Sequence, residues 1–261
     1  MLPEQRYRFL AQHLADAEGN RQAVKRLTAE YPDLTVEDGY LIQRELVALK
    51  RTQGHRVLAT KMGFTSRAKM KQMNVYEPIY GYIFDYMAIQ DGVLPMSEVI
   101  HPKVEAEIAF ILGREIEGPG ITGAQVLAAT EYVVPALEVI DSRYQRFEFT
   151  LPDVIADNTS ASRVVIGSTL RKPSELELDL VGVTLSIQGQ LKETGAGAAV
   201  LGHPANSVAM LANMLARRGE KLKAGQLILT GGITGAHPLT AGDVVLAQWD
   251  GLGSIQLVVT E

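Results

Sequence analysis

His-Pro-Lys-Val-Glu-Ala-Glu-Ile-Ala-Phe, residues 101–110, places Glu105 and Glu107 in alternation with apolar side chains. Successive side chains of a strand point to opposite faces, so this pattern predicts a strand that carries both carboxylates on one face. Glutamate is depleted in strands and neighbouring like charges repel, so the pair requires a compensating cation. A hard divalent ion such as Mg²⁺ or Mn²⁺ suits such oxygen ligands. A solvated face of a sheet explains the same alternation, and these two residues alone leave both interpretations open.

A third glutamate, Glu138, interrupts the apolar run Tyr-Val-Val-Pro-Ala-Leu-Glu-Val-Ile of residues 132–140. Such a run is typical of a buried element, where an unpaired carboxylate is costly. Glu138 therefore strengthens the metal interpretation of Glu105 and Glu107.

The pattern of apolar residues changes near residue 57. Before it, Leu10, Leu14 and the stretch from Val24 to Leu27 recur at helical intervals, and Thr35 is suited to cap a helix that ends near Gly54. After it, short apolar runs broken by Gly and Pro predict strands, at residues 79–81, 180–187, 227–230, 244–249 and 255–259. Two further helices are predicted at residues 124–132 and 204–218. We expect an α+β, mostly β fold, with an N-terminal helical region of residues 1–56 and a second domain of residues 57–261.

Composition narrows the functional class. The chain has 261 residues and a net charge of −5. This balance argues against a nucleic-acid surface, so we expect small molecules or proteins as partners. The chain has no cysteine, which excludes disulfides, thiolate nucleophiles and Cys-ligated zinc and fits a reducing compartment. Its first residues do not resemble a signal peptide, and no apolar run approaches the length of a membrane span. We therefore expect a soluble, cytoplasmic protein without a membrane partner.

Several polar residues have two interpretations each. Lys61 follows a strand-like start, and is either partly enclosed or a surface lysine whose stem lies along the protein. His203 precedes a predicted helix, so a cap competes with a role in a site. Asp141 and Arg143 form either a polar turn or support for a metal ligand. The segment Asp157-Asn158-Thr159-Ser160 fits turn chemistry as well as substrate binding. The sequence contains no nucleophile elbow, HExxH motif, dinucleotide fingerprint or P-loop.

Six segments in order make nearly the whole chain similar to the fumarylacetoacetate hydrolase superfamily. They are Lys61-Met62-Gly63, Lys103-Val104-Glu105-Ala106-Glu107, Val134-Pro135-Ala136-Leu137-Glu138, Ala156-Asp157-Asn158, Leu201-Gly202-His203-Pro204 and Leu229-Thr230-Gly231. Within the superfamily, the chain resembles the branch of hydratases and decarboxylases of catechol meta-cleavage pathways. The resemblance implies rolled, mixed β-sheets and a catalytic domain at residues 57–261.

The resemblance also implies a set of site residues. Glu105, Glu107 and Glu138 would bind Mg²⁺ or Mn²⁺, and Lys61 would be the catalytic cation that hydrogen-bonds a developing enolate or donates a proton to it. The implied substrate contacts are Tyr80, Asp141, Arg143, Asn158, Ser160, His203 and Thr230.

Ile79 favours the decarboxylases of this branch over the hydratases. The hydratases typically have an acidic residue here, in a Pro-Asp-Phe-Gly or Pro-Asp-Tyr-Gly motif, whereas this chain has Pro78-Ile79-Tyr80-Gly81. A hydratase needs a group that activates water, and a decarboxylase benefits from excluding it. The implied activity is that of a carbon–carbon lyase, which converts 2-oxohex-3-enedioate to 2-hydroxypenta-2,4-dienoate and CO₂.

Two alternatives stay open, a 2-oxopent-4-enoate hydratase and a non-catalytic partner subunit that binds the ligand. The resemblance further implies a homo-oligomer and a complex with the hydratase of the pathway.

Overall fold

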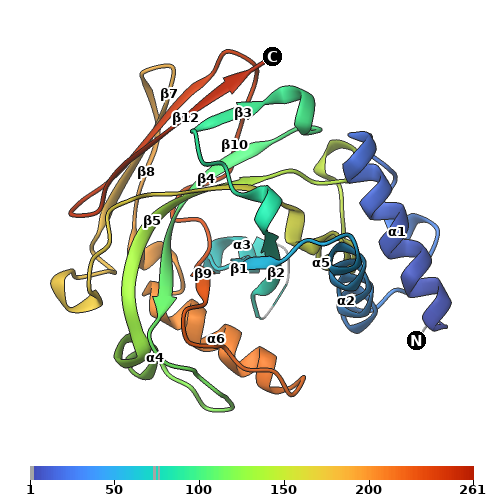
Figure 1. Ribbon diagram of the computed structural model, residues 1–261, viewed down its shortest axis with the longest axis horizontal. Helices are drawn as coiled ribbons and strands as arrows, with labels where there is room; N and C mark the ends of the chain where they lie inside the picture. Colours follow the sequence, from blue (N-terminus) through green and yellow to red (C-terminus); the bar gives the residue numbers. More distant parts are fainter. Residues whose placement is uncertain (1–2, 73–74, 76) are drawn as a thin grey trace.

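The computed structural model describes residues 3–72, 75 and 77–261, and within this part of the chain the strands form two sheets. The seven-stranded sheet has the order β2-β1-β9-β4-β5-β6, with β10 paired to β4. Its strands are β1 (Val57–Gly63), β2 (Ile79–Phe84), β4 (Lys103–Leu112), β5 (Thr130–Ile140), β6 (Ala161–Ile166), β9 (Leu227–Leu229) and β10 (His237–Pro238). The long antiparallel pair β4–β5 runs through the middle of the molecule (Figure 1).

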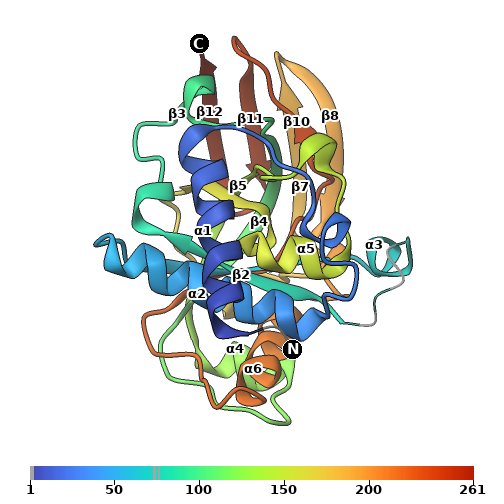
Figure 2. The ribbon, with the colours of Figure 1, turned by 90° about the vertical axis from the view of Figure 1, so that its right-hand side faces the viewer.

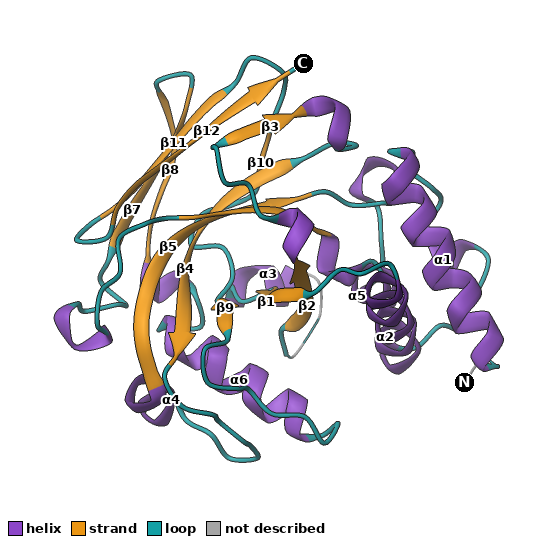
Figure 3. Cartoon of the chain, in the orientation of Figure 1, coloured by secondary structure: helices purple, strands orange, loops and turns teal. Residues whose placement is uncertain are grey.

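The second sheet has five strands among the described residues, in the order β3-β12-β11-β7-β8. They are β3 (Val93–Pro95), β7 (Gly182–Ile187), β8 (Gln190–Ala196), β11 (Val244–Trp249) and β12 (Gly253–Thr260). Along β7 and β11, buried side chains alternate with more exposed ones, so one face of this sheet lies on the core and the other faces outward. Figure 3 shows this sheet on the side of the molecule opposite the N-terminal helices.

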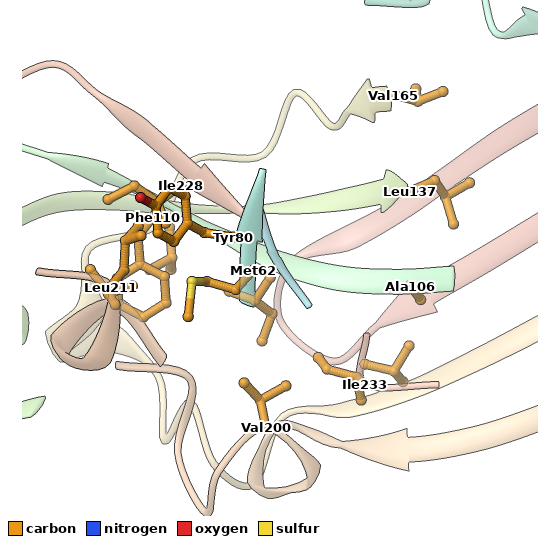
Figure 4. Close-up of a cluster of buried hydrophobic side chains, with 14 of the residues drawn as sticks. Met62, Tyr80, Ala106, Phe110, Leu137, Val165, Val200, Leu211, Ile228 and Ile233 are labelled. Carbon is orange, nitrogen blue, oxygen red and sulfur yellow. The ribbon is translucent and has the colours of Figure 1, made fainter. Parts of the chain in front are cut away.

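The main hydrophobic core joins the two sheets. Phe110 and Leu137 come from the long strands, Met62 and Ile228 from their neighbours, and Leu211 from a covering helix (Figure 4). Val245 and Leu257 of the second sheet belong to the same cluster. Because one continuous core supports both sheets, β4 and β5 are held rigidly along the stretch that carries the glutamates.

The helices lie outside this core. They are α1 (Glu4–Asn20), α2 (Val36–Thr52), α3 (Arg67–Gln72), α4 (Gly123–Ala129), α5 (Leu151–Ala156) and α6 (Pro204–Ala216). Thr35 caps α2 through a capping box with Asp38, as predicted. Helices α1 and α2 cross each other on one side of the molecule (Figure 2). None of the helices in the described chain is long and apolar enough to span a membrane.

The structure confirms the N-terminal helices and the α+β class, and it corrects two details of the prediction. Val24 is not helical, because it forms a bridge with Tyr144, and Leu27 lies in a short 3₁₀ turn. The helix predicted at residues 124–132 ends at Ala129, because residues 130–132 pair with β4.

Tyr144 and Ala156 pack in the same cluster as α1 and α2, so the N-terminal helices are anchored to the rest of the chain. The domain boundary between residues 56 and 57 stays a prediction.

Candidate active site

Three carboxylates converge at the centre of the β4–β5 pair. Glu105 and Glu107 lie two residues apart on β4, and Glu105 stands directly opposite Glu138 on β5. Directly paired residues of antiparallel strands share a face. One oxygen of each carboxylate lies within 4.8 Å of the others. Glu107 and Glu138 are fully buried, and Glu105 is 7% exposed.

Glu107 and Glu138 have hydrogen-bonding capacity that the described residues do not use. The Gly231 N–H donates to Glu107 Oε2 at 2.7 Å, but Glu107 Oε1 and Glu138 Oε1 have no hydrogen-bond partner among the described residues. Burial raises the pKa of Glu138 to about 7, and burial together with the charges of Glu138 and Glu105 raises the pKa of Glu107 well above its usual value. Oxygen donors that are buried, close and unsatisfied fit a divalent cation such as Mg²⁺ or Mn²⁺.

Lys61 lies beside these carboxylates and is enclosed, since only 2% of it is exposed. Its Nζ is 3.1 Å from Glu138 Oε2 and donates to the Thr159 carbonyl at 3.1 Å. Burial lowers the pKa of Lys61, but Glu138, Glu105 and Glu107 outweigh burial and raise the pKa above its usual value. The side chain is therefore an ammonium group, able to donate hydrogen bonds or a proton.

The Thr159 carbonyl comes from a strained segment. Asn158, Thr159 and Ser160 have φ angles of 50°, 55° and 54°, a left-handed conformation that non-glycine residues rarely adopt in succession. The Asn158 side chain ties this segment to the Tyr82 backbone, with a donated and an accepted hydrogen bond of 2.8 Å each. A Cβ at Gly81 would lie 2.5 Å from the Asn158 carbonyl oxygen, so glycine is required for this close contact.

A cavity of about 370 Å³ lies next to the carboxylates and Lys61. One part of its lining is apolar and is formed by Ile79, Ile140, Phe147, Phe149 and Val154. The polar part comprises Lys61, Lys103, Glu105, Thr65, Ser66, Thr159 and Ser160. Gly232 also lines it, and a Cβ there would lie 2.4 Å from Glu105 Oε2. Any side chain at position 232 would therefore displace a carboxylate of the centre.

Two of the predicted substrate contacts differ in their place relative to this cavity. Ser160 lines it, and its Oγ donates to Asp157 at 3.2 Å. Tyr80 points to the other face of β2, where its ring stacks on Tyr40 with centroids 4.8 Å apart. Tyr80 lines a separate cavity of about 310 Å³ beside α2.

Arg143 and Asp141 are buried and hydrogen-bonded within the protein. The Arg143 guanidinium donates to Asp157 Oδ1 at 2.5 Å and to the carbonyls of Asp141, Ala161 and Asp157. Burial would lower the pKa of Arg143, but Asp157 raises it above its usual value. Asp141 accepts from the N–H groups of Ile100 and His101 at 2.8 Å each. Neither residue lines the cavity beside the carboxylates.

Thr230 and His203 have structural partners as well. Thr230 Oγ1 donates to the Ile108 carbonyl at 2.7 Å, which holds the next residue, Gly231, against Glu107. His203 caps α6, since its Nδ1 accepts from the Ala205 N–H at 3.0 Å. Both residues lie outside the cavity lining, and their roles as substrate contacts stay predictions.

The cavity is also lined by three residues that were not predicted from the sequence, Lys103, Phe147 and Phe149. The strand period could have predicted Lys103, because it precedes Glu105 by two residues and therefore shares its face of the strand. Phe147 and Phe149 lie in a connection between β5 and α5, where no periodicity indicates which side chains turn inward.

Comparison with known proteins places this geometry in a family. Over 247 residues the chain is 48% identical to 4-oxalocrotonate decarboxylase of Pseudomonas sp. strain CF600, covering 94% of each chain. It is 38% identical to 2-oxo-hept-4-ene-1,7-dioate hydratase of Escherichia coli, covering 98% of each chain. It superposes with a TM-score of 0.97 and 44% identity on 4-oxalocrotonate decarboxylase from Pseudomonas putida G7 complexed with magnesium and adipate, covering 99% of each chain. The family model for the C-terminal region of fumarylacetoacetate hydrolase matches residues 59–260, so the chain belongs to the fumarylacetoacetate hydrolase family.

Proposed function

We propose that this protein decarboxylates 2-oxohex-3-enedioate to 2-hydroxypenta-2,4-dienoate and CO₂ with a divalent metal ion, as part of catechol meta-cleavage. The observation that carries the proposal is the convergence of Glu105, Glu107 and Glu138 beside the Lys61 ammonium and an apolar wall, with oxygens of Glu107 and Glu138 that have no hydrogen-bond partner among the described residues. Relatives that match nearly the whole chain are named as decarboxylases of this substrate.

The metal ligands in this proposal are Glu105, Glu107 and Glu138. A Mg²⁺ or Mn²⁺ ion held by them supplies Lewis-acid stabilisation for the negative charge that develops on the 2-oxo oxygen of the substrate. The solved relative complexed with magnesium supports this choice of ion.

Lys61 is placed to act on the same oxygen. When the bond to the C6 carboxylate breaks, its electron pair moves through the alkene to the 2-oxo oxygen, and CO₂ leaves as a neutral molecule. Lys61 Nζ is fixed by Glu138 and the Thr159 carbonyl, so it hydrogen-bonds the developing enolate without reorganisation. A proton from Lys61 to this oxygen completes the enol product.

In this proposal, Ile79, Phe147 and Phe149 exclude water from the cavity. Ile79 is 3% exposed and lines the cavity. Its strand, β2, carries no acidic residue. An apolar wall strengthens the charge interactions at the metal ligands and offers water no base at position 79. This is the feature that favours decarboxylation over hydration.

A hydratase is the second candidate, because curated relatives at 38% identity are named as hydratases. It would use the same carboxylates and Lys61, but it needs a residue that activates water where this chain has Ile79. A non-catalytic partner subunit has less support, since Lys61 and the three glutamates are all present.

The deciding experiment measures CO₂ release from 2-oxohex-3-enedioate by the purified protein, with Mg²⁺ and after treatment with EDTA. We expect Mg²⁺-dependent release, and none from Glu107→Gln protein. Supplying 2-hydroxypenta-2,4-dienoate and assaying 4-hydroxy-2-oxopentanoate tests the hydratase. Formation of 4-hydroxy-2-oxopentanoate in the second assay without CO₂ release in the first would show that the protein is a hydratase and not a decarboxylase. Full CO₂ release in EDTA would refute the metal mechanism.

The assembly and location remain parts of the proposal. We expect a homo-oligomer in the cytoplasm that associates with the hydratase of the pathway, for which the resemblance to meta-cleavage enzymes is the support.

A further inference from the structure

Lys103 occupies the next position along the face of β4 that carries the metal ligands. It precedes Glu105 by two residues and pairs with Ile140, which makes Lys103–Ile140 the next pair on the same face as Glu105–Glu138. Successive pairs on one face are about 7 Å apart along a strand. Lys103 and Ile140 both line the cavity beside the carboxylates. A cation and a carboxylate cluster are thus set on successive pairs of one face, beside the same cavity.

The Lys103 ammonium rests on an aromatic ring. Its Nζ lies 4.0 Å from the centroid of the Phe147 ring, which attracts a cation through its π face. The ring also contacts His101, whose ring is tilted by 43° against it with centroids 4.7 Å apart. Within the described residues, Lys103 forms no ion pair with a carboxylate, so its three N–H groups remain available to an anion.

We propose that Lys103 binds the far carboxylate of a six-carbon 2-oxo diacid and thereby selects diacids over monoacids, while Phe147 holds the ammonium in position. The inference rests on the proposed function, because it assumes that the 2-oxo end of the substrate lies at the carboxylate centre. It assigns to the opposite end of the substrate a residue that was not among the substrate contacts predicted from the sequence.

The contact has a distinctive kinetic consequence. The far carboxylate is the group that leaves as neutral CO₂, so its ion pair with Lys103 is strongest before the reaction and weakens as the bond breaks. An interaction that favours the ground state over the transition state lowers KM without raising kcat. Once the anion is gone, the Phe147 ring stabilises the ammonium. Loss of Lys103 should therefore raise KM and leave kcat equal to or above that of the unmodified protein.

Two ligands that differ only at the far end test the proposal. 2-Oxohexanedioate and 2-oxohexanoate share the 2-oxo acid group and the saturated chain, which ends in a carboxylate in the first and a methyl group in the second. Without the alkene, neither loses CO₂ by the proposed route. Their affinities for the Mg²⁺-loaded full chain are measured by calorimetry for the unmodified protein, Lys103→Met and Phe147→Leu. Lys221→Met is the matched control, because Lys221 pairs with Glu115 on the surface.

We expect Lys103→Met to weaken 2-oxohexanedioate binding by at least about tenfold, as for a lost hydrogen bond between charged groups, and to leave 2-oxohexanoate binding unchanged. Phe147→Leu should weaken the diacid by a smaller factor, and Lys221→Met should change neither ligand. An equal loss for both ligands, or no loss for either, would overturn the role of Lys103 while the proposed function stands. If neither ligand binds the unmodified protein in a Mg²⁺-dependent manner, the proposed function fails first and the assignment of Lys103 fails with it.

Discussion

Two buried ionic clusters in this protein are built from similar residues but differ in how they are satisfied. The Arg143 cluster engages every nitrogen of the guanidinium, on Asp157 and on three backbone carbonyls. The carboxylate centre leaves Glu107 Oε1 and Glu138 Oε1 without a partner among the described residues. Buried charges are tolerated when they are paired and hydrogen-bonded. The first cluster therefore stabilises the fold as it stands, whereas the second is arranged for a ligand.

The largest effect is expected from replacing Lys61, the cation of the carboxylate centre. Lys61→Ala should lower kcat by a factor on the order of 10² to 10⁴, because it removes the group that stabilises or protonates the enolate. Mg²⁺ affinity should remain nearly intact, since Lys61 donates no ligand oxygen. CO₂ release gives kcat, and calorimetric titration gives the Mg²⁺ affinity.

A matched control for Lys61 is Lys50→Ala. Lys50 is also buried and pairs with Glu18 at 2.6 Å, but it lies outside the cavity lining. We expect it to change the free energy of unfolding and not kcat. Unchanged turnover in Lys61→Ala would remove the catalytic role of this lysine and make the two clusters equivalent.

Replacing Arg143 should lower the stability of the fold rather than change the chemistry of the carboxylate centre. Arg143→Met leaves Asp157 as a buried, unpaired carboxylate, and we expect it to lower the free energy of unfolding by about 3 to 5 kcal/mol. Urea denaturation measures this change. Arg146→Met is the control, because Arg146 forms an exposed pair with Glu148 and exposed pairs contribute little to stability. An Arg143→Met protein of normal stability that binds the substrate poorly would return Arg143 to the list of substrate contacts.

The sequence predicts one half of the carboxylate centre and not the other. The two-residue period of a strand is enough to place Glu105 and Glu107 on one face. That Glu138 stands opposite Glu105 depends on the register of β4 against β5, which is a tertiary property that no local pattern contains. The family resemblance supplied this association instead.

The same two-residue period separates two of the predicted site residues. Ile79 and Tyr80 are adjacent in β2, so their side chains point to opposite faces, and Tyr80 stacks on Tyr40 rather than lining the cavity beside the carboxylates. The family resemblance implied substrate contacts for Arg143, Asn158 and Thr230, whose hydrogen bonds in the structure are made inside the protein, so these contacts stay predictions. Composition cannot distinguish a polar group that binds a ligand from one that ties down a loop.

Removing one carboxylate should reveal the unsatisfied character of the centre. In EDTA, Glu107→Gln should raise the free energy of unfolding by on the order of 1 kcal/mol, because it removes a carboxyl group whose ionisation is disfavoured by burial and by the charges of Glu138 and Glu105. The amide oxygen of glutamine can still accept from the Gly231 N–H. With Mg²⁺ at about 100 times its dissociation constant, the unmodified protein should gain about 2.7 kcal/mol, and the variant should gain much less.

Thermal or urea denaturation with and without Mg²⁺ gives all four stabilities. A Glu107→Gln protein that is less stable than the unmodified chain in EDTA would show that the centre is satisfied without a metal. The distinction between the two clusters would then be lost.

The smallest effect concerns His203, which is satisfied as a helix cap and was predicted as a substrate contact. Burial lowers its pKa, against the opposing charges of Asp179 and Glu177, so the folded protein keeps the ring neutral while the unfolded chain takes up a proton near pH 6.5. Because the unfolded state then binds more protons, this contribution is complete above pH 6.5 and is lost as the pH falls below it. A charged ring would also lie unfavourably at the N-terminus of α6.

His203→Asn keeps an acceptor that caps helices well but does not titrate. We expect it to match the unmodified protein at pH 8 within about 1 kcal/mol, and to lose less stability between pH 7 and pH 5, as followed by urea denaturation at each pH. Glu261→Gln, at the exposed end of the chain, is a control that should preserve the original pH dependence in this range. Identical pH dependence in His203→Asn would mean that folding does not hold the ring neutral, and a greater loss of stability in the variant than in the unmodified protein would mean that the folded protein favours the protonated ring. In that state its Nδ1 could not accept from the Ala205 N–H, so the cap would be excluded and a role for the cation in binding an anionic substrate would become the better explanation.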